Sequence, residues 1–291
     1  MKKIVILGCE NSHAEAFLEF IKKDPGYPDI DVIGVYSDEA EPAKALGEKF
    51  GVAVMEDYAD GVGKVDAVMV TARHGDNHLK YALPYIESGV PMFIDKPFTV
   101  SEDEAIELVT RCKAANVRLT GGSSLRHDPY IQELKADATN KVDGETLGGT
   151  LRAPLASDSA YGGFYFYAGH LTEMVLEVFG KNPKSVKAYS AGKQITVVFR
   201  YGAFDVTGVF VEHGYSCYYA SRYSENTIKG QKIDLANSPC FKLEFEEFYN
   251  LLCGKEMTNT YSDFVAPVFV MNAIKCSIDS GNEEIIKEYE L

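Results

Sequence analysis

The sequence predicts an α/β protein with two halves: a doubly wound parallel sheet, followed by an α+β domain built on an open, mostly antiparallel sheet. The first prediction comes from continuous apolar runs that alternate with amphipathic stretches over residues 1–121, because strands that are buried on both faces need helices on both faces. The second comes from residues 122–291, where apolar and polar side chains alternate along strand-like segments. The predicted domains are therefore 1–121 and 122–291.

Five apolar runs predict the strands of the first half, at residues 3–8, 31–36, 65–71, 90–95 and 117–121. The helices between them show the i, i+3, i+4, i+7 spacing of an amphipathic helix, most clearly at residues 14–21 and 105–112. Ser101 and Glu104 form a capping box at the start of the second of these helices.

The second half predicts a hairpin, a further strand and three helices. Residues 194–201 and 203–212 alternate in polarity and are joined near Gly202, as in an antiparallel hairpin, and residues 215–221 predict another strand. Helices are predicted at 170–179, 241–253 and 265–280, each followed by a glycine that would end it, namely Gly180, Gly254 and Gly281.

The composition is that of a soluble globular protein: of 291 residues, 46% are apolar and 25% are charged. The formal net charge of −14 repels phosphate backbones, and no basic stripe interrupts it, so nucleic acid is not an expected partner. No window approaches the ~18 consecutive apolar residues that span a bilayer, and the first apolar run is too short for a signal peptide, which favours a cytoplasmic location. The scattered cysteines lack C-x-x-C spacing and predict neither a metal site nor a disulfide.

The stretch VILGCENSHAEAF passes from an apolar strand through Gly8 into an amphipathic helix, as the pyrophosphate-binding turn of a Rossmann-like dinucleotide domain does. Asn11 or Ser12 would cap the helix and leave its first N–H groups available to an anion. Glu10 and His13 stand where a G-x-G-x-x-G fingerprint has its second and third glycines. The turn therefore predicts either a pyrophosphate site of altered geometry or a strand-to-helix turn that binds nothing.

Further candidate ligand residues follow the later strands, because an open parallel sheet binds ligands at the carboxyl ends of its strands. Ser37 and Asp38 follow the strand at 31–36. Asp38 would reach the adenosine ribose hydroxyls and repel a 2′-phosphate, which favours NAD over NADP, although it also fits a helix N-terminus in an acidic cluster. The end of the strand at 65–71 brings four more candidates, which are Thr71, Arg73, His74 and His78.

The segment FIDKPF places Lys96 directly after a buried strand, beside Asp95 and before Pro97. Partial burial and a cationic nicotinamide would suit this lysine to moving a proton during hydride transfer. The same D-K-P sequence is also an ordinary strand-ending turn, and this alternative stays open.

The predicted helix around residues 167–180 has two faces. Its core face repeats at i, i+3, i+4, i+7 and consists of Leu171, Met174, Val175 and Val178. The opposite stripe carries His170, Glu173 and Glu177. His170 follows a stretch rich in glycine and aromatic residues, and it either faces a cleft between the domains or caps a helix with a solvated acidic face.

Taken in order, these segments resemble the Gfo/Idh/MocA family of nicotinamide-dependent sugar and polyol oxidoreductases. The resemblance rests on the strand–turn–helix start and on VDAVMVTARHGDNH, GVPMFIDKPF, TGGSSLRHDP, GHLTEMVLEVFG and FEEFYNLLCGKE, in that order along nearly the whole chain. It implies a Rossmann domain followed by an open-faced α/β domain, with the active site between them.

The resemblance also implies roles for individual residues. Lys96 takes the position of the lysine in the family's E-K-P motif, which contacts nicotinamide and substrate. His170 takes the position of the acid/base histidine that removes the hydroxyl proton as hydride leaves the adjacent carbon. The positions that line the nicotinamide side are Thr71, His74, His78 and Asp95. Arg126, at the turn that opens the second domain, is implied to be structural.

The sequence departs from the family in three places. The family's acid four residues before the histidine is Phe166 here, so Glu173, one turn later, is the candidate replacement. E-K-P has become D-K-P. The phosphate turn carries Glu10 and is shorter by about three residues.

We therefore predict an NAD(P)-dependent oxidoreductase acting on a sugar, inositol or similar polyol, with Lys96, His170 and Glu173 as catalytic residues. The predicted cofactor residues are Gly8, Glu10, Asn11, Ser12, Ser37, Asp38, Thr71, His74, His78, Asp95 and Lys96. Two alternatives stay open: a non-catalytic relative that binds a sugar-like ligand or a partner protein, and an enzyme of elimination or glycoside cleavage that recycles NAD in place. The open second sheet predicts a homo-oligomer.

Overall fold

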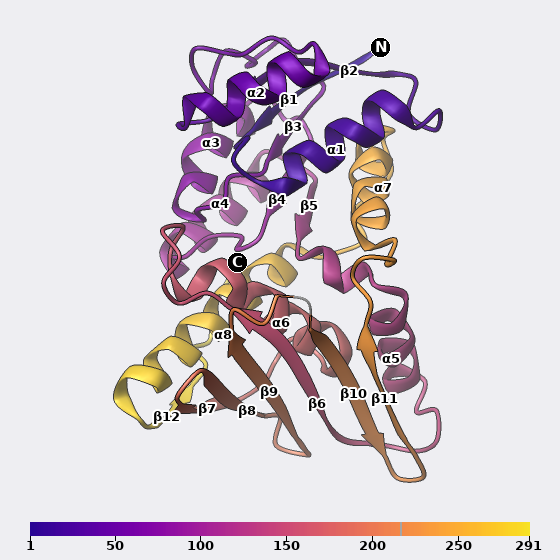
Figure 1. Cartoon of the computed structure of the whole chain (residues 1–291), viewed down its shortest axis with the longest axis vertical. Coiled ribbons are helices and arrows are strands. Elements are labelled where there is room, and N and C mark those ends of the chain that lie inside the picture. The colour runs from indigo at the N-terminus through magenta and orange to yellow at the C-terminus, as the bar shows by residue number, and fades with distance from the viewer. Residues whose placement is uncertain (216) are drawn as a thin grey trace. The chain divides into compact units, whose positions relative to one another are not determined.

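The structure is a computed structural model that describes residues 1–215 and 217–291 (Figure 1). The chain divides into two compact units. The first consists of residues 1–122, 241–264 and 291, and the second of residues 123–240 and 265–290. These units are defined by compactness in space and not by independent folding. The predicted domain boundary after residue 121 therefore stays a prediction.

The first unit contains a five-stranded sheet in which every pair of neighbouring strands is parallel. Its strands are β1 (Lys2–Leu7), β2 (Ile30–Tyr36), β3 (Ala67–Val70), β4 (Met92–Asp95) and β5 (Leu119–Gly122), in the spatial order β2-β1-β3-β4-β5. The predicted parallel sheet is thus confirmed. The strand order reverses between β1 and β3, so their carboxyl ends form the switch point at which open α/β sheets bind ligands.

Amphipathic helices cover this sheet. They are α1 (Ser12–Lys23), α2 (Ala40–Phe50), α3 (Asp76–Ile86), α4 (Glu102–Ala114) and α7 (Cys240–Leu252). The predicted caps are present: the Asn11 side chain accepts from the His13 N–H at the start of α1, and Ser101 accepts from the Glu104 N–H at the start of α4. Although α7 is distant in sequence, it lies beside α1 (Figure 1) and packs onto it, with the rings of Phe245 and Phe17 5.5 Å apart.

The second unit contains a seven-stranded sheet that is antiparallel except for the parallel pair β6–β9. Its strands are β6 (Thr146–Leu155), β7 (Ser185–Ala191), β8 (Gln194–Arg200), β9 (Asp205–Glu212), β10 (Tyr218–Ser224), β11 (Ile228–Ile233) and β12 (Glu283–Ile285), in the order β11-β10-β6-β9-β8-β7-β12. The predicted hairpin is β8–β9. β10 covers the end of the strand predicted at 215–221, and residue 216 of that prediction lies outside the described residues.

The remaining elements are the 3-10 helix η1 (Ser124–His127), α5 (Pro129–Thr139), α6 (Phe164–Phe179) and α8 (Tyr261–Ser280). In the core of the second unit, α6 packs with apolar side chains of β6, β9, α5 and α8. α6 begins at Phe164 and not at residue 170, because the break in the chain is Gly162–Gly163, both with positive φ (93° and 56°). His170 therefore lies inside the helix, which corrects its predicted place at the helix start.

Helix ends follow the prediction more closely. Gly180, Gly254 and Gly281 directly or closely follow α6, α7 and α8 and have φ values of 102°, 87° and 68°, which suit glycine at a helix end. None of the helices in the described part of the chain combines the length and the apolar character that crossing a lipid bilayer requires.

Candidate functional site

Gly8 shapes the turn that follows β1 at the switch point of the first sheet. Its φ is +101°, and a Cβ built there would lie 2.1 Å from the backbone N of Ala72, so only glycine fits. The Gly8 N–H donates to the Tyr36 carbonyl at the end of β2 over 2.7 Å. On the other side, the buried Thr71 hydroxyl donates to the Gly8 carbonyl over 2.7 Å. The turn thus keeps the first glycine of a dinucleotide fingerprint and is bound to both neighbouring strands.

The Glu10 carboxylate joins the ends of β2 and β3. Its Oε2 accepts from the Ser37 hydroxyl over 2.6 Å, and its Oε1 accepts from the Arg73 backbone N–H over 2.9 Å. Glu10 therefore places a negative charge at the switch point and engages two donors there. Sequence analysis identified Glu10 as a departure from the glycine pattern, but not these partners.

Asp95, at the end of β4, binds the turn from the opposite side. Its Oδ2 accepts from Asn11 Nδ2 over 2.6 Å and lies 2.9 Å from His13 Nδ1, while its Oδ1 accepts from the Lys96 backbone N–H over 2.7 Å. Burial opposes ionisation of this fully buried carboxyl, but the charge and hydrogen bond of His13 and the nearby Lys96 outweigh it and hold the pKa of Asp95 below its ordinary value. His13 is thus an ion-pair partner of Asp95. Sequence analysis treated His13 only as the position of a missing glycine.

Lys96 lies in the loop that follows β4, and His78 of α3 contacts the same loop. Lys96 is 5% exposed and precedes Pro97 through a cis peptide bond. The ring nitrogens of His78 lie 2.8 Å from the Ala72 carbonyl and 3.1 Å from the Phe98 carbonyl. Complete burial lowers the pKa of His78 against the opposing effect of these carbonyls. His78 holds the loop that carries Lys96 to the chain that follows β3.

Three other predicted cofactor residues lie nearer the surface. Asp38 accepts from the Tyr36 hydroxyl over 2.7 Å and from Lys80 Nζ over 3.0 Å. Nδ1 of His74 accepts from the Asp76 N–H over 3.3 Å at the start of α3. The Ser12 hydroxyl is 3.5 Å from Asn11 Oδ1. The structure thus brings Glu10 and Ser37 together, and Asn11, Asp95 and Lys96 together, whereas Asp38 pairs with Lys80.

His170, in the second unit, has a partner that sequence analysis missed. Its Nδ1 lies 2.7 Å from the Ser123 hydroxyl, and the two residues are 8% and 0% exposed. The rings of Tyr167 and Tyr218 lie 5.6 and 6.1 Å from the His170 ring. The only sequence signal for Ser123 is a hydroxyl residue directly after the glycine pair that ends the strand at 117–121.

The acidic stripe of α6 is buried, which overturns the alternative of a solvated face. Glu173 and Glu177 are 3% and 7% exposed. Glu173 Oε2 accepts from the Ser123 N–H over 2.8 Å and lies 3.5 Å from Arg126 Nη1, while Arg126 Nε is 3.7 Å from Glu177 Oε2. Arg126 is therefore a buried cation between two carboxylates of one helix, and its implied structural role stays a prediction.

Glu177 meets three cations. Burial opposes its ionisation, but Arg126, Lys181 and Lys135 together hold the pKa of this carboxyl far below its ordinary 4.5. Lys135 and Lys181 Nζ lie 2.6 and 3.0 Å from its oxygens. The network is therefore an anchor for α6, the helix that carries His170.

Replacing Glu177 by glutamine is expected to lower the free energy of unfolding by about 3 kcal/mol at pH 7, because the buried Arg126 guanidinium loses one of its carboxylate partners. A lowered pKa in the folded state stabilises the protein above the ordinary pKa of 4.5, and this stabilisation is lost as the pH falls through the folded value. The difference between wild type and Glu177→Gln in urea unfolding should therefore close as the pH falls below 4.5.

The matched control is Glu133→Gln on α5, whose pair with Lys229 is half exposed and is worth less than about 0.5 kcal/mol. A Glu177→Gln deficit that stays constant down to about pH 3 would show that the carboxylate charge is not its source.

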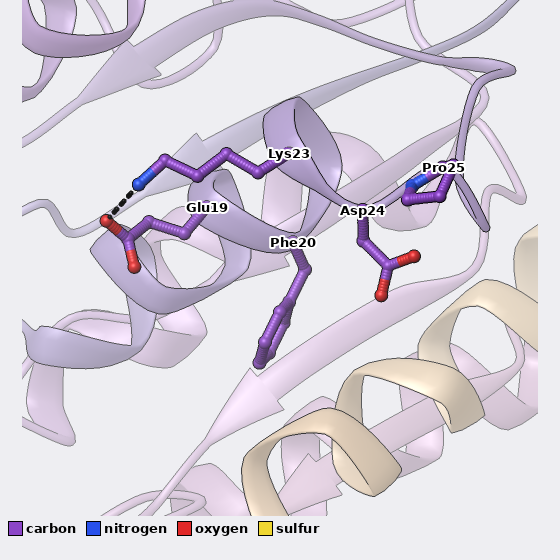
Figure 2. Close-up of a pocket in the computed structure, with 5 residues that line it drawn as sticks. All are labelled: Glu19, Phe20, Lys23, Asp24 and Pro25. Atoms are coloured by element: carbon purple, nitrogen blue, oxygen red, sulfur yellow. Dashed lines mark hydrogen bonds and ion pairs between the residues drawn. The ribbon is translucent and has the colours of Figure 1, made fainter.

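A shallow hollow lies at the C-terminal end of α1 (Figure 2). Its lining residues are Glu19, Phe20, Lys23, Asp24 and Pro25, and Figure 2 shows the ion pair between Glu19 and Lys23 within it. None of these five residues belongs to the predicted site, and the hollow is separate from the carboxyl ends of the strands.

A doubly wound parallel sheet with a glycine turn at its switch point, joined to a unit with an open mixed sheet, defines a two-unit protein with a Rossmann-like nucleotide-binding fold. Residues 2–123 match the profile of the Gfo/Idh/MocA family, described as an oxidoreductase family with an NAD-binding Rossmann fold. The likeness to this family covers the N-terminal residues 2–123, and residues 124–291 lie outside the match. No curated protein matches the sequence.

Solved structures share this fold over the whole chain. The myo-inositol dehydrogenase of Corynebacterium glutamicum is similar with a TM-score of 0.83 at 15% identity, covering 99% of this chain and 100% of that one. The myo-inositol 2-dehydrogenase of Lactobacillus plantarum has a TM-score of 0.84 at 13% identity, covering 98% and 99%. The scyllo-inositol dehydrogenase of Lactobacillus casei, solved with NAD(H) and scyllo-inositol, has a TM-score of 0.83 at 13% identity, with the same coverage. At these identities the likeness establishes the fold.

Proposed function

We propose that the protein is an NAD(P)-dependent oxidoreductase that transfers hydride between nicotinamide and a sugar, inositol or similar polyol. The observation that carries this proposal is the buried Asp95 carboxylate, which binds Asn11 and His13 of the phosphate turn and the backbone of Lys96. One charged group thereby fixes the turn where a pyrophosphate would lie relative to the lysine assigned to the nicotinamide end. The fold shared with inositol dehydrogenases supports the substrate class.

The residues around the switch point fit a dinucleotide in most respects. Gly8 provides the tight turn, and Asn11 caps α1, whose N-terminus favours an anion. The Asp38 carboxylate follows β2, where it would hold ribose hydroxyls and repel a 2′-phosphate, so we propose NAD over NADP. The Glu10 charge opposes the pyrophosphate and is a feature of the turn that does not fit a dinucleotide. When bound, the nicotinamide supplies the hydride acceptor or donor.

The remaining chemistry belongs to the chain's own residues. We propose that Lys96 donates a hydrogen bond from Nζ to the reacting oxygen of the substrate and so stabilises negative charge on it. We propose that His170 takes the hydroxyl proton at its Nε2, since its Nδ1 is engaged with Ser123. Glu173 binds the Ser123 backbone, so its proposed contribution is to hold the residues around His170.

The proposal is tested first by titrating the purified protein with NADH and with NADPH and following nicotinamide fluorescence. The chain has no tryptophan to act as an energy donor, so the reduced cofactor is excited directly. We expect micromolar binding of NADH and weaker binding of NADPH. Absence of binding up to millimolar NADH, in a folded sample stripped of endogenous ligand, would overturn the proposal.

Glu10→Gly is expected to tighten NADH binding about tenfold, which corresponds to about 1.4 kcal/mol. The substitution removes a negative charge from the turn and releases the Ser37 hydroxyl and the Arg73 N–H for the ligand. Glu10→Gln keeps the size of the side chain and removes only the charge, so it separates the two causes. Weaker binding in both variants would identify Glu10 as a ligand contact and not as an obstacle.

One observation favours a second candidate function, a non-catalytic relative that binds a sugar-like ligand or a partner protein. Glu10 already engages a hydroxyl and a backbone N–H that a dinucleotide would use. If neither wild type nor Glu10→Gly binds NADH, this candidate is the better description, and a screen of sugars by thermal shift would follow.

A further inference from the structure

Ser123 lies directly after β5 and begins the turn into η1, where its side chain accepts from the Leu125 N–H over 3.3 Å. The same hydroxyl lies 2.7 Å from Nδ1 of His170. Both residues are buried and both belong to the second unit. Phe166, one turn before His170, offers no carboxylate in the position where the family resemblance places one.

We propose that Ser123 is the positioning residue of His170 and replaces the carboxylate that would otherwise orient the ring. The effect on turnover rests on the proposed function, whereas the pairing itself does not. A buried hydroxyl 2.7 Å from a ring nitrogen fixes the rotation of the imidazole and directs Nδ1 toward Ser123.

The hydrogen-bond capacity of serine makes this partner different from a carboxylate. A hydroxyl has one proton and two acceptor lone pairs, and the Leu125 N–H uses one of the lone pairs. When Nε2 is the basic nitrogen, Nδ1 carries the ring proton, and the second lone pair of Ser123 Oγ accepts from it in the neutral ring and in the imidazolium alike. A carboxylate can only accept, and it would favour the charged imidazolium. Ser123 therefore orients the ring in both protonation states and stabilises the cation less than a carboxylate would.

Glu173 and Arg126 hold Ser123 in place. The Ser123 backbone N–H donates to Glu173 Oε2 over 2.8 Å, and that oxygen lies 3.5 Å from Arg126 Nη1. His170 and Glu173 are on the same face of α6 at i and i+3, so one helix face presents both the ring and the group that fixes its partner. Glu173, predicted to replace the missing acid, thus reaches His170 through Ser123.

The pairing is tested by NMR of the histidine side chains in wild type, Ser123→Ala, Ser123→Asp and Ser123→Thr, with His170 assigned by the signal lost in His170→Asn. The groups that surround the ring in the second unit, namely Glu173, Arg126, Tyr167 and Tyr218, are the same in all four proteins. We expect Ser123→Ala to change the ring ¹⁵N shifts that report the tautomer, and Ser123→Thr to restore them. We expect Ser123→Asp to move the titration of His170 to higher pH.

Ser124→Ala removes the neighbouring serine, which is also buried, and serves as the matched control. It should leave the His170 signals unchanged. Identical ¹⁵N shifts and titration of His170 in wild type and Ser123→Ala, or no upward movement in Ser123→Asp, would overturn the pairing.

Kinetics then test the catalytic consequence. Ser123→Ala is expected to lower kcat about tenfold with little change in KM, and Ser123→Asp to shift the acid limb of the pH–rate profile to higher pH. A fall in kcat that is no larger than the loss of folded protein would contradict a positioning role. If no turnover or NADH binding is found while the NMR changes occur, the proposed function has failed and the pairing stands.

Discussion

Replacing Lys96 by alanine is expected to lower kcat/KM for polyol oxidation about 10³-fold while the protein stays folded. Lys96 is buried directly after β4, and Asp95 accepts its backbone N–H, a bond that alanine retains. The position of the chain is therefore preserved, and the loss comes from the ammonium group that we assign to the reacting oxygen. Initial rates with NAD⁺ and inositol, together with thermal melting, measure the two quantities separately.

The control is Lys64→Ala, which removes an exposed lysine of the same unit that donates to the Asp60 carbonyl. It should change neither the rate nor the melting temperature. Methylamine should restore part of the activity of Lys96→Ala, because a small cation can enter the space of the lost side chain. Wild-type turnover in Lys96→Ala would exclude Lys96 from the reaction.

The parallel sheet of the first unit could be predicted because its signals are local. Each strand is an apolar run of a few residues, and each helix shows its own amphipathic period. In the second unit, β6 was missed because its sequence contains Gly148 and Gly149, which indicate a break in a single strand. Gly149 is required by packing: a Cβ there would lie 2.3 Å from Phe179 Cζ and 2.3 Å from the Ser221 carbonyl oxygen. That requirement depends on residues far along the chain.

The phosphate turn shows the same division between local and distant causes. The conformation at Gly8 and the Asn11 cap follow from a few neighbouring residues and were predicted. The partners of Glu10 were not, because Ser37 and Arg73 are 27 and 63 residues away. The sequence shows that the two glycines are absent. The partners of the side chains that replace them can be seen only in the structure, where β2, β1 and β3 end side by side.

The acidic stripe of α6 was ambiguous for a physical reason. Helical spacing places His170, Glu173 and Glu177 on one face, but it does not say whether that face meets water or cations. The answer comes from Arg126 in η1, together with Lys135 of α5, whose Nζ is 2.6 Å from Glu177. Carboxylates with such partners are tolerated when buried, and a solvated face was therefore the wrong alternative.

His170→Asn is expected to lower kcat/KM by about 10²- to 10⁴-fold, the range for loss of a general acid or base. Asparagine can still form a hydrogen bond with Ser123, so the contact between α6 and Ser123 is kept while the titratable nitrogen is lost. The residual rate should lose its acid limb, because asparagine has no group that titrates in place of the imidazole. The measurement is the pH dependence of kcat/KM.

His213→Asn is the matched control for that experiment, because His213 belongs to the same unit, is exposed, and has a φ of +56° that asparagine tolerates. Its pH profile should coincide with that of the wild type. If His170→Asn kept the acid limb, the base would be another group, and His170 would be left as a buried partner of Ser123. If the limb vanished only in His170→Asn, the proton would be assigned to the buried histidine whose Nδ1 lies 2.7 Å from the Ser123 hydroxyl, and the acid limb would report the protonation of that ring.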